Sequence, residues 1–377
     1  MRSINYFFIA VAVLIILGLQ YLKRHEVMKK KGQRRTISVM GWFVAVGLIL
    51  AVVFFPFYPS IPVTGPHAFQ VRTIQFTQPD RKDPYRPDQN RTLVMDYYYP
   101  VSDRLANRSV PLVVFSHGGI STRKGNVSLF SELASHGYAV ASLDHPYQAL
   151  YTTINCRKVW MNGKYFHELM GENSHRDIEH SFECFQRWMT IRVQDMDAAI
   201  HYLTDRAMKG EEAFAIINPK AIGVGGHSLG GSAALGVARL RPDIKAVLVL
   251  ESPYLADITG TLDKNFTWNQ APYKAAILNI YSDSSMPLVE KDHKYAQNKR
   301  HLVHTDQLNY LHIQGTNHFT LTDLVRESPL FCALIGGRYE TAGEVGLKQI
   351  NRAAIAFFAK NLKEDVEGLA SASDVHP

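Results

Sequence analysis

The stretch Ile222-Gly223-Val224-Gly225-Gly226-His227-Ser228-Leu229-Gly230-Gly231 decides the fold, because it joins two local patterns within ten residues. Residues 222–225 are small and apolar, which predicts a buried strand. Residues 232–240 carry the small and apolar side chains of a helix that packs closely on a sheet. Gly-x-Ser-x-Gly between a strand and a helix is typical of a strained turn, whose glycines let neighbouring backbones pass closely. The stretch therefore predicts an α/β fold with Ser228 at a strand-to-helix turn.

Apolar runs alternate with helical periodicity on both sides of this turn. Predicted strands cover 69–77, 93–99, 112–116, 138–143, 222–225, 246–250, 276–281 and 311–313, and predicted helices cover 127–136, 192–203, 232–240 and 350–362. Residues 79–90 contain three prolines and predict a loop. Continuous apolar strands that alternate with helices indicate a mostly parallel sheet covered on both faces. We expect this sheet to organise residues 61–363.

Two segments interrupt the alternation. Residues 151–189 are rich in histidine, aromatic and charged side chains with weak periodicity, and residues 251–272 are irregular. Both follow predicted strands, where α/β folds place the loops that surround an active site. We expect residues 151–189 to form a cap over the pocket. The polar tail, residues 364–377, is predicted to be disordered.

The residue types around the turn point to nucleophilic catalysis. Ser228 is the candidate nucleophile, and the N–H of Leu229, at the start of a helix, points toward a developing oxyanion. A second motif, His-Gly-Gly, directly follows the predicted strand 112–116. Loops of this kind complete an oxyanion hole with a backbone N–H. Gly119 or Ile120 would supply that second donor.

A base and an acid are expected to follow the nucleophile in the chain. His318 comes directly after the last predicted strand, as expected for the base when the chain order is serine, acid, histidine. Asp283 follows the strand 276–281, where most folds of this class place the acid. Glu251 follows the preceding strand, 246–250, and either carboxylate could orient the imidazole. The residues alone leave both candidates open.

These motifs resemble the plasma-type platelet-activating factor acetylhydrolases and their bacterial relatives, over roughly residues 65–362. The resemblance rests on Pro111-Leu112-Val113-Val114-Phe115-Ser116-His117-Gly118, Leu133-Ala134-Ser135-His136-Gly137-Tyr138, Asp144-His145-Pro146, Gly226-His227-Ser228-Leu229-Gly230-Gly231 and Gly315-Thr316-Asn317-His318. It implies an α/β-hydrolase fold with a cap insertion, and hydrolysis of phospholipids with short or oxidised sn-2 acyl chains without a metal or organic cofactor. It also favours Glu251 over Asp283 as the acid, although the family usually has Asp at this position.

The first sixty residues predict a membrane hairpin. Residues 6–22 and 37–58 are apolar stretches of 17 and 22 residues, near the 20 or so residues that a spanning helix needs. The basic residues between them are Lys23, Arg24, Lys29, Lys30, Lys31, Arg34 and Arg35. A short basic loop stays in the cytoplasm, so the catalytic domain is predicted on the extracytoplasmic side of the cell membrane. A cleaved signal peptide is the alternative for the first stretch.

Charge and cysteine content exclude several other classes of protein. Residues 23–35 carry a net charge of +6 out of +7 for the chain, and a near-neutral body argues against nucleic-acid binding. Cys156, Cys184 and Cys332 form no Cys-x-x-Cys pair, which argues against a metal site. Cys156 and Cys184 could form a disulfide in an oxidising compartment, and three free thiols are the alternative.

The sequence thus predicts a serine carboxylic-ester hydrolase with a lipid or lipophilic ester as substrate. A general carboxylesterase or polyester-type hydrolase is a second hypothesis from the same motifs. A catalytically inactive hydrolase fold that serves as a membrane scaffold is a third, and the intact Ser228 and His318 argue against it.

Overall fold

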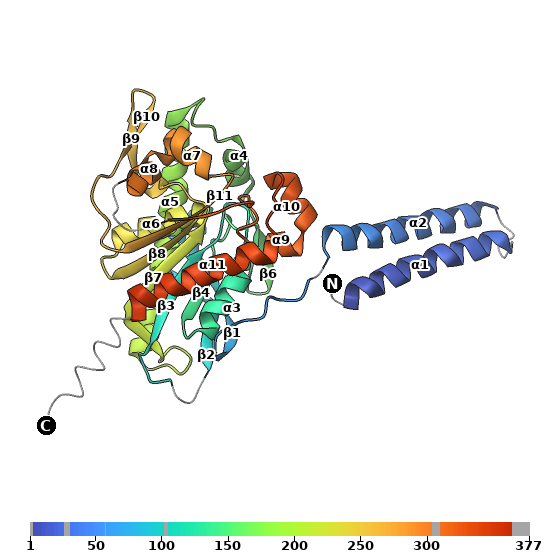
Figure 1. The fold of residues 1–377 in the computed structure, drawn as a ribbon, viewed down its shortest axis with the longest axis horizontal. Helices are drawn as coiled ribbons and strands as arrows, with labels where there is room; N and C mark the ends of the chain where they lie inside the picture. Colours follow the sequence, from blue (N-terminus) through green and yellow to red (C-terminus); the bar gives the residue numbers. More distant parts are fainter. Residues whose placement is uncertain (1–2, 26–30, 57, 102–104, 304–309, 364–377) are drawn as a thin grey trace.

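A computed structural model describes residues 3–25, 31–56, 58–101, 105–303 and 310–363. Figure 1 shows a hairpin of two long helices that projects from an α/β body. The body is built on one sheet of eight strands in the order β1-β2-β4-β3-β7-β8-β11-β12. These strands are β1 (Ala68–Asp83), β2 (Arg86–Val101), β3 (Val110–Ser116), β4 (Ala139–Asp144), β7 (Ile217–His227), β8 (Ile244–Leu250), β11 (Ala276–Ser282) and β12 (Tyr310–Ile313).

The sheet is mostly parallel, as the sequence predicts. The six strands from β4 to β12 in the sheet order pair in parallel, and β1 and β2 add an antiparallel edge. Helices α5 (Ile178–Met208) and α6 (Leu229–Leu240) pack against one face, and α3 (Val127–Ser135) and α11 (Gly343–Phe358) pack against the other. Successive side chains of a strand point to opposite faces, so both sides of β3 are buried. This double burial explains the continuous apolar runs.

The smaller elements fill the connections between the strands and helices above. They are β5 (Tyr151–Ile154), β6 (Arg157–Trp160), α4 (Gly163–Gly171), η1 (Leu255–Asp257), β9 (Ile258–Leu262), β10 (Asn265–Trp268), α7 (Met286–Lys291), η2 (His293–Tyr295), α8 (Ala296–Val303), α9 (Leu324–Glu327), α10 (Pro329–Gly336) and the π-helical turn η3 (Ala359–Lys363). The segment 251–272 thus contains a short hairpin, β9–β10, rather than only irregular structure.

The prediction of a loop over residues 79–90 is wrong. Strands β1 and β2 continue through it and meet at a two-residue turn after Asp83. Pro79 is tolerated because β1 is an edge strand and its register shifts between Thr77 and Lys82, and Pro84 lies in the turn itself. The long hairpin carries charged side chains back over the body, where two of them become buried.

The segment predicted as a cap contains the β5–β6 hairpin and α4, but its last part belongs to the core. Helix α5 begins at Ile178 rather than near residue 192. Asp177 caps it by accepting a hydrogen bond from the N–H of His180. The buried face of this first half includes polar Ser181 and the thiol of Cys184, which obscured its apolar periodicity.

The three cysteines are free thiols in the structure, which is one of the two alternatives that the sequence left open, and Cys156 does not pair with Cys184. Cys156 is exposed at the turn between β5 and β6, whereas Cys184 and Cys332 are buried. The Cys184 sulfur instead accepts a hydrogen bond from Arg187, which lies one turn further along α5.

Helices α1 (Ser3–Arg24) and α2 (Lys31–Phe54) form the N-terminal hairpin. Both are long and apolar enough to cross a membrane, and α1 also has the position of a signal sequence. Helix α2 ends at Phe54, before the predicted limit at residue 58, because Pro56 and Pro59 cannot continue it. The Phe54 carbonyl accepts a hydrogen bond from the hydroxyl of Ser328, so α2 ends beside the start of α10. The predicted disordered tail, residues 364–377, lies outside the described residues.

Candidate active site

Ser228 occupies the turn between β7 and α6 with an unusual backbone conformation. Its φ of 53° and ψ of −126° lie where residues other than glycine are strained. The turn is held because the Ser228 N–H donates to the carbonyl of Leu250 at 2.8 Å. A Cβ on Gly226 would lie 2.2 Å from the Gly230 backbone, and one on Gly230 would lie 2.0 Å from the Ser116 carbonyl oxygen. Any side chain at position 226 or 230 would clash with backbone atoms, so both positions require glycine.

The structure brings His318 and Glu251 together beside this turn. Nδ1 of His318 lies 3.3 Å from Oε2 of Glu251, whose side chain is fully buried. The other carboxylate oxygen accepts hydrogen bonds from the Ser285 hydroxyl (2.6 Å) and from the Ser282 N–H. Burial alone would raise the pKa of Glu251, but the contacts with His318, Ser285 and Ser282 more than offset it and lower the pKa below its ordinary value. Glu251 is therefore ionised and faces the imidazole.

Asp283, the other acid candidate, is placed differently. It is exposed, and its carboxylate pairs with Nε2 of His312 at 2.7 Å and accepts the N–H of Gly315 at 2.8 Å. Asp283 thus ties together the strand and turn that lead to His318, and it does not pair with the His318 ring.

His227 connects the nucleophile turn to the histidine loop. Burial, together with the nearby His318, lowers the pKa of His227 to about 3, so its ring is neutral. Its Nε2 lies 3.0 Å from the carbonyl oxygen of His318, to which the neutral ring donates. The two rings are 4.6 Å apart. This contact fixes the backbone of His318 next to Ser228.

The loop after β3 lies against the same turn. A Cβ on Gly118 would lie 3.5 Å from the Ser228 Cβ, and one on Gly119 would lie 3.3 Å from Cδ1 of Leu229. Leu229 is the first residue of α6, so its N–H has no partner within the helix. The N–H groups of Gly119 and Ile120 donate to no partner among the described backbone hydrogen bonds outside helices and strands. Leu229 and the Gly118–Gly119 part of the loop therefore lie beside Ser228.

A family model described as "Platelet-activating factor acetylhydrolase, isoform II" matches residues 91–375, which is well over half of the chain. The chain belongs to this family. It is therefore a carboxylic ester hydrolase with an α/β-hydrolase fold. Among solved structures, a ferulic acid esterase from Streptomyces cinnamoneus has the same fold, with a TM-score of 0.58 and 18% identity, over 80% of this chain and 92% of that one. A comparison with curated proteins gave no match.

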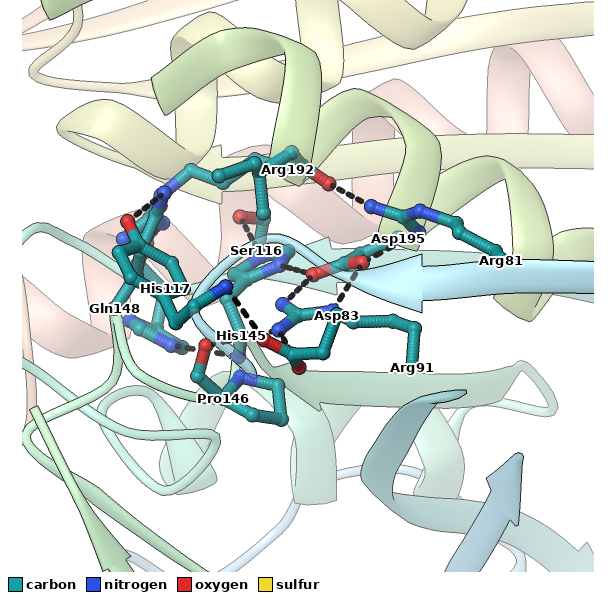
Figure 2. Close-up of polar contacts among 12 residues, drawn as sticks. Arg81, Asp83, Arg91, Ser116, His117, His145, Pro146, Gln148, Arg192 and Asp195 are labelled. Carbon is teal, nitrogen blue, oxygen red and sulfur yellow. Dashed lines mark hydrogen bonds and ion pairs between the residues drawn. The ribbon is translucent and has the colours of Figure 1, made fainter. Parts of the chain in front are cut away.

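Close to the Ser228 turn lies a second Ser–His–acid arrangement, with Asp as the acid, that sequence reasoning missed. The Ser116 hydroxyl lies 2.8 Å from Nε2 of His145, whose Nδ1 lies 2.9 Å from Oδ2 of Asp195 (Figure 2). All three side chains are fully buried, so no substrate reaches Ser116. Burial lowers the pKa of His145 to about 4. The neutral ring therefore donates to Asp195 and accepts from Ser116, which makes this a structural linkage between β3, the end of β4 and α5.

Two arginines from the β1–β2 hairpin complete this network (Figure 2). Arg91 donates two hydrogen bonds to Asp195, at 2.6 and 3.1 Å, and a third to Asp83 at 2.8 Å. Arg81 adds a contact to Asp195 at 2.7 Å. Burial would raise the pKa of Asp195, but Arg91 beside it holds the pKa well below its usual range. In the sequence, residues 79–90 of this hairpin show charged residues without apolar alternation, and no local pattern indicates that they reach Asp195.

One group of side chains outside the site has the donor types of a metal centre. His175, Asp292 and His293 place their ligand atoms within 4.8 Å of one another, between the end of the cap segment and the loop after α7. The cysteine spacing on which the prediction of no metal site rests carries no information about this group, because its members are distant in sequence.

Proposed function

We propose that the chain hydrolyses carboxylic esters by two-step acyl transfer, with Ser228 as nucleophile, His318 as base and Glu251 as acid. The observation that carries the proposal is the contact of Nδ1 of His318 with the buried, ionised Glu251, beside the strained turn of Ser228. With Nδ1–H donated to the carboxylate, Nε2 of His318 is left unprotonated and able to accept the serine proton. Asp283 is proposed instead to support the turn before His318.

The acyl transfer uses groups of this chain only. His318 takes the Ser228 proton as the hydroxyl oxygen attacks the ester carbonyl. The N–H of Leu229 and that of Gly119 or Ile120 stabilise the oxyanion that forms. The protonated imidazole then gives its proton to the leaving alcohol. In the second step His318 activates water, which releases the acid and regenerates the Ser228 hydroxyl.

We propose phospholipids with short or oxidised sn-2 acyl chains as the substrate class, in line with the family description. A membrane-side location favours lipophilic esters. Helix α10 exposes Leu330, Phe331, Leu334 and Ile335 next to the end of α2. If α2 spans a bilayer, this apolar face lies at its surface, where it can bury apolar area among the lipids. The body would then be held with the His318 loop, which precedes α10, near the lipid.

A substrate comparison tests the proposal. The full-length protein in detergent is assayed on a phosphatidylcholine with an sn-2 acetyl group and on p-nitrophenyl acetate, beside Ser228→Ala. We expect hydrolysis of both, with the phospholipid preferred, and a loss of at least about a thousandfold in Ser228→Ala. Ser109→Ala, in the loop before β3, is the matched control and should retain full activity.

The outcomes separate the competing functions. Cleavage of the aryl ester without the phospholipid would identify a general carboxylesterase and overturn the lipid assignment. A folded protein that cleaves neither ester would favour the inactive scaffold. Equal activity of Ser228→Ala and the wild type would remove Ser228 as nucleophile.

A further inference from the structure

Arg192 is a fully buried guanidinium whose hydrogen-bond partners are all uncharged. Nε donates to the side-chain oxygen of Gln148 at 2.8 Å, Nη1 to the carbonyl of His117 at 2.6 Å, and Nη2 to the carbonyl of Gly118 at 3.3 Å (Figure 2). Asp195, one turn along α5, is bonded to other side chains, and Arg192 forms no ion pair within the described residues. A buried charge is costly unless nearby dipoles stabilise it. Here the dipoles are mainly those of the loop after β3.

Tyr165 contacts the same loop from the cap segment. Its hydroxyl lies 3.3 Å from the carbonyl oxygen of Gly119, to which it donates, and 3.4 Å from Nη2 of Arg192. The Tyr165 ring is buried edge-to-face against Trp188, with ring centres 5.7 Å apart. Arg192 in α5 and Tyr165 in α4 therefore reach two consecutive carbonyls, those of Gly118 and Gly119, from two different helices.

Each of these carbonyls shares a peptide unit with a candidate oxyanion donor. The Gly118 carbonyl is joined to the N–H of Gly119, and the Gly119 carbonyl is joined to the N–H of Ile120. In a trans peptide the two groups point in opposite directions, so fixing the carbonyl aims the N–H. A hydrogen bond to the carbonyl also polarises the N–H and strengthens it as a donor. His117 Nδ1 lies 2.6 Å from the Gly118 carbonyl oxygen and fixes the same unit.

We propose that Arg192 and Tyr165 are positioning residues for the oxyanion hole. They hold the two loop peptides from behind and strengthen the N–H groups that face Ser228, without touching the substrate. The inference rests on the proposed function, because it assigns a role only if acyl transfer takes place at Ser228. If the inference holds, the rate of acyl transfer depends on how α4 packs against the body.

The test uses Tyr165→Phe and Arg192→Lys in the full-length protein. The kcat and KM for p-nitrophenyl acetate are measured beside the inhibition constant of an aryl trifluoromethyl ketone, which forms an oxyanion on the serine. Tyr165→Phe should lower kcat about three- to tenfold, and Arg192→Lys about ten- to a hundredfold. In both, KM should stay within about twofold, and the ketone should bind more weakly by the same factor as kcat falls, because only the oxyanion state is affected.

Two matched variants control for a general loss of stability. Tyr97→Phe removes another buried hydroxyl that donates to a carbonyl, that of Ala213 at 3.0 Å. Arg239→Lys alters an arginine outside the site that is partly buried and paired with Asp257. Both should lower the thermal midpoint without changing kcat or ketone affinity per folded molecule.

Two results would overturn the inference. One is a Tyr165→Phe enzyme with wild-type kcat and ketone affinity. The other is a loss of activity in both variants that follows the folded fraction alone, with the ketone unaffected. Tyr165→Phe removes only a hydroxyl, so it decides the question even where Arg192→Lys does not fold. Failure of the proposed function is distinct, because the wild type itself would then lack Ser228-dependent hydrolysis.

Discussion

The buried Glu251 carboxylate accepts hydrogen bonds from three groups, His318, Ser282 and Ser285. A glutamate side chain is one methylene longer than an aspartate, and the Glu251 backbone follows β8 with a φ of 55°, which turns the chain sharply at the end of the strand. The Ser282 N–H and the Ser285 hydroxyl hold one carboxylate oxygen, so the other is fixed toward His318. In this way the longer side chain keeps a single orientation.

Substitution of the two acid candidates separates their roles. Glu251→Gln keeps the shape but removes the charge that stabilises protonated His318, so kcat should fall by about a thousandfold or more. Asp283→Asn weakens exposed contacts to His312 and to the N–H of Gly315, both away from the His318 ring, and should change kcat less than about threefold. Steady-state kinetics on p-nitrophenyl acetate measures both. A larger loss in Asp283→Asn than in Glu251→Gln would reverse the assignment.

At the scale of elements, the turn between β7 and α6 depends on close backbone contact. A Cβ on Gly230 would collide with the Ser116 carbonyl, and backbone atoms cannot yield as a side chain does. Gly230→Ala should therefore lower the free energy of unfolding by about 3 kcal/mol or more and abolish activity. Gly163→Ala in α4 is the control, because its Cβ meets open space. Urea unfolding measures both variants, and equal free energies of unfolding for Gly230→Ala and Gly163→Ala would contradict the account.

Some of these elements could be predicted from the sequence and others could not. The sheet, the turn of Ser228 and the loop of Gly119 were predictable, because glycine spacing and apolar runs are local signals. The extension of β1 and β2 was not, because buried contacts of Arg91 with Asp83 and Asp195 stabilise it. The first half of α5 was not, because its buried face includes the polar Ser181 and Cys184. Whether Glu251 or Asp283 faces His318 also depends on the register of distant strands.

For the whole molecule, buried neutral histidines predict loss of stability in acid. The pKa of His145 is lowered to about 4 and that of His227 to about 3, from 6.5. At pH values between these lowered pKa values and 6.5, the unfolded chain binds more protons than the folded one. The free energy of unfolding therefore falls as the pH drops below about 6.5. We expect a loss of about 2 kcal/mol per histidine between pH 7 and pH 5.

Urea unfolding of the full-length protein in detergent at the two pH values measures this loss. His145→Asn should reduce the dependence on pH, whatever its own stability, because one titrating group is removed. A free energy of unfolding that is unchanged or higher at pH 5 would contradict the assignment of neutral rings.

The hairpin of α1 and α2 predicts which side of the membrane holds the body. If the hairpin spans the membrane with the basic segment 23–35 in the cytoplasm, as the sequence predicts, the exposed thiol of Cys156 lies outside, while Cys184 and Cys332 are buried. A membrane-impermeant maleimide should therefore label intact cells that express the full-length protein, and Cys156→Ser should abolish the label. Labelling that requires lysis would place the body in the cytoplasm.

Ser228 is the group on which the proposed chemistry depends, and a fluorophosphonate probe addresses it directly. The full-length protein is treated with the probe, and the modified residue is located by peptide mass spectrometry. We predict one adduct, on Ser228, that is absent from Ser228→Ala, with the buried Ser116 unmodified. An adduct on another serine while Ser228 stays unmodified, or no adduct on the folded wild type, would contradict the account.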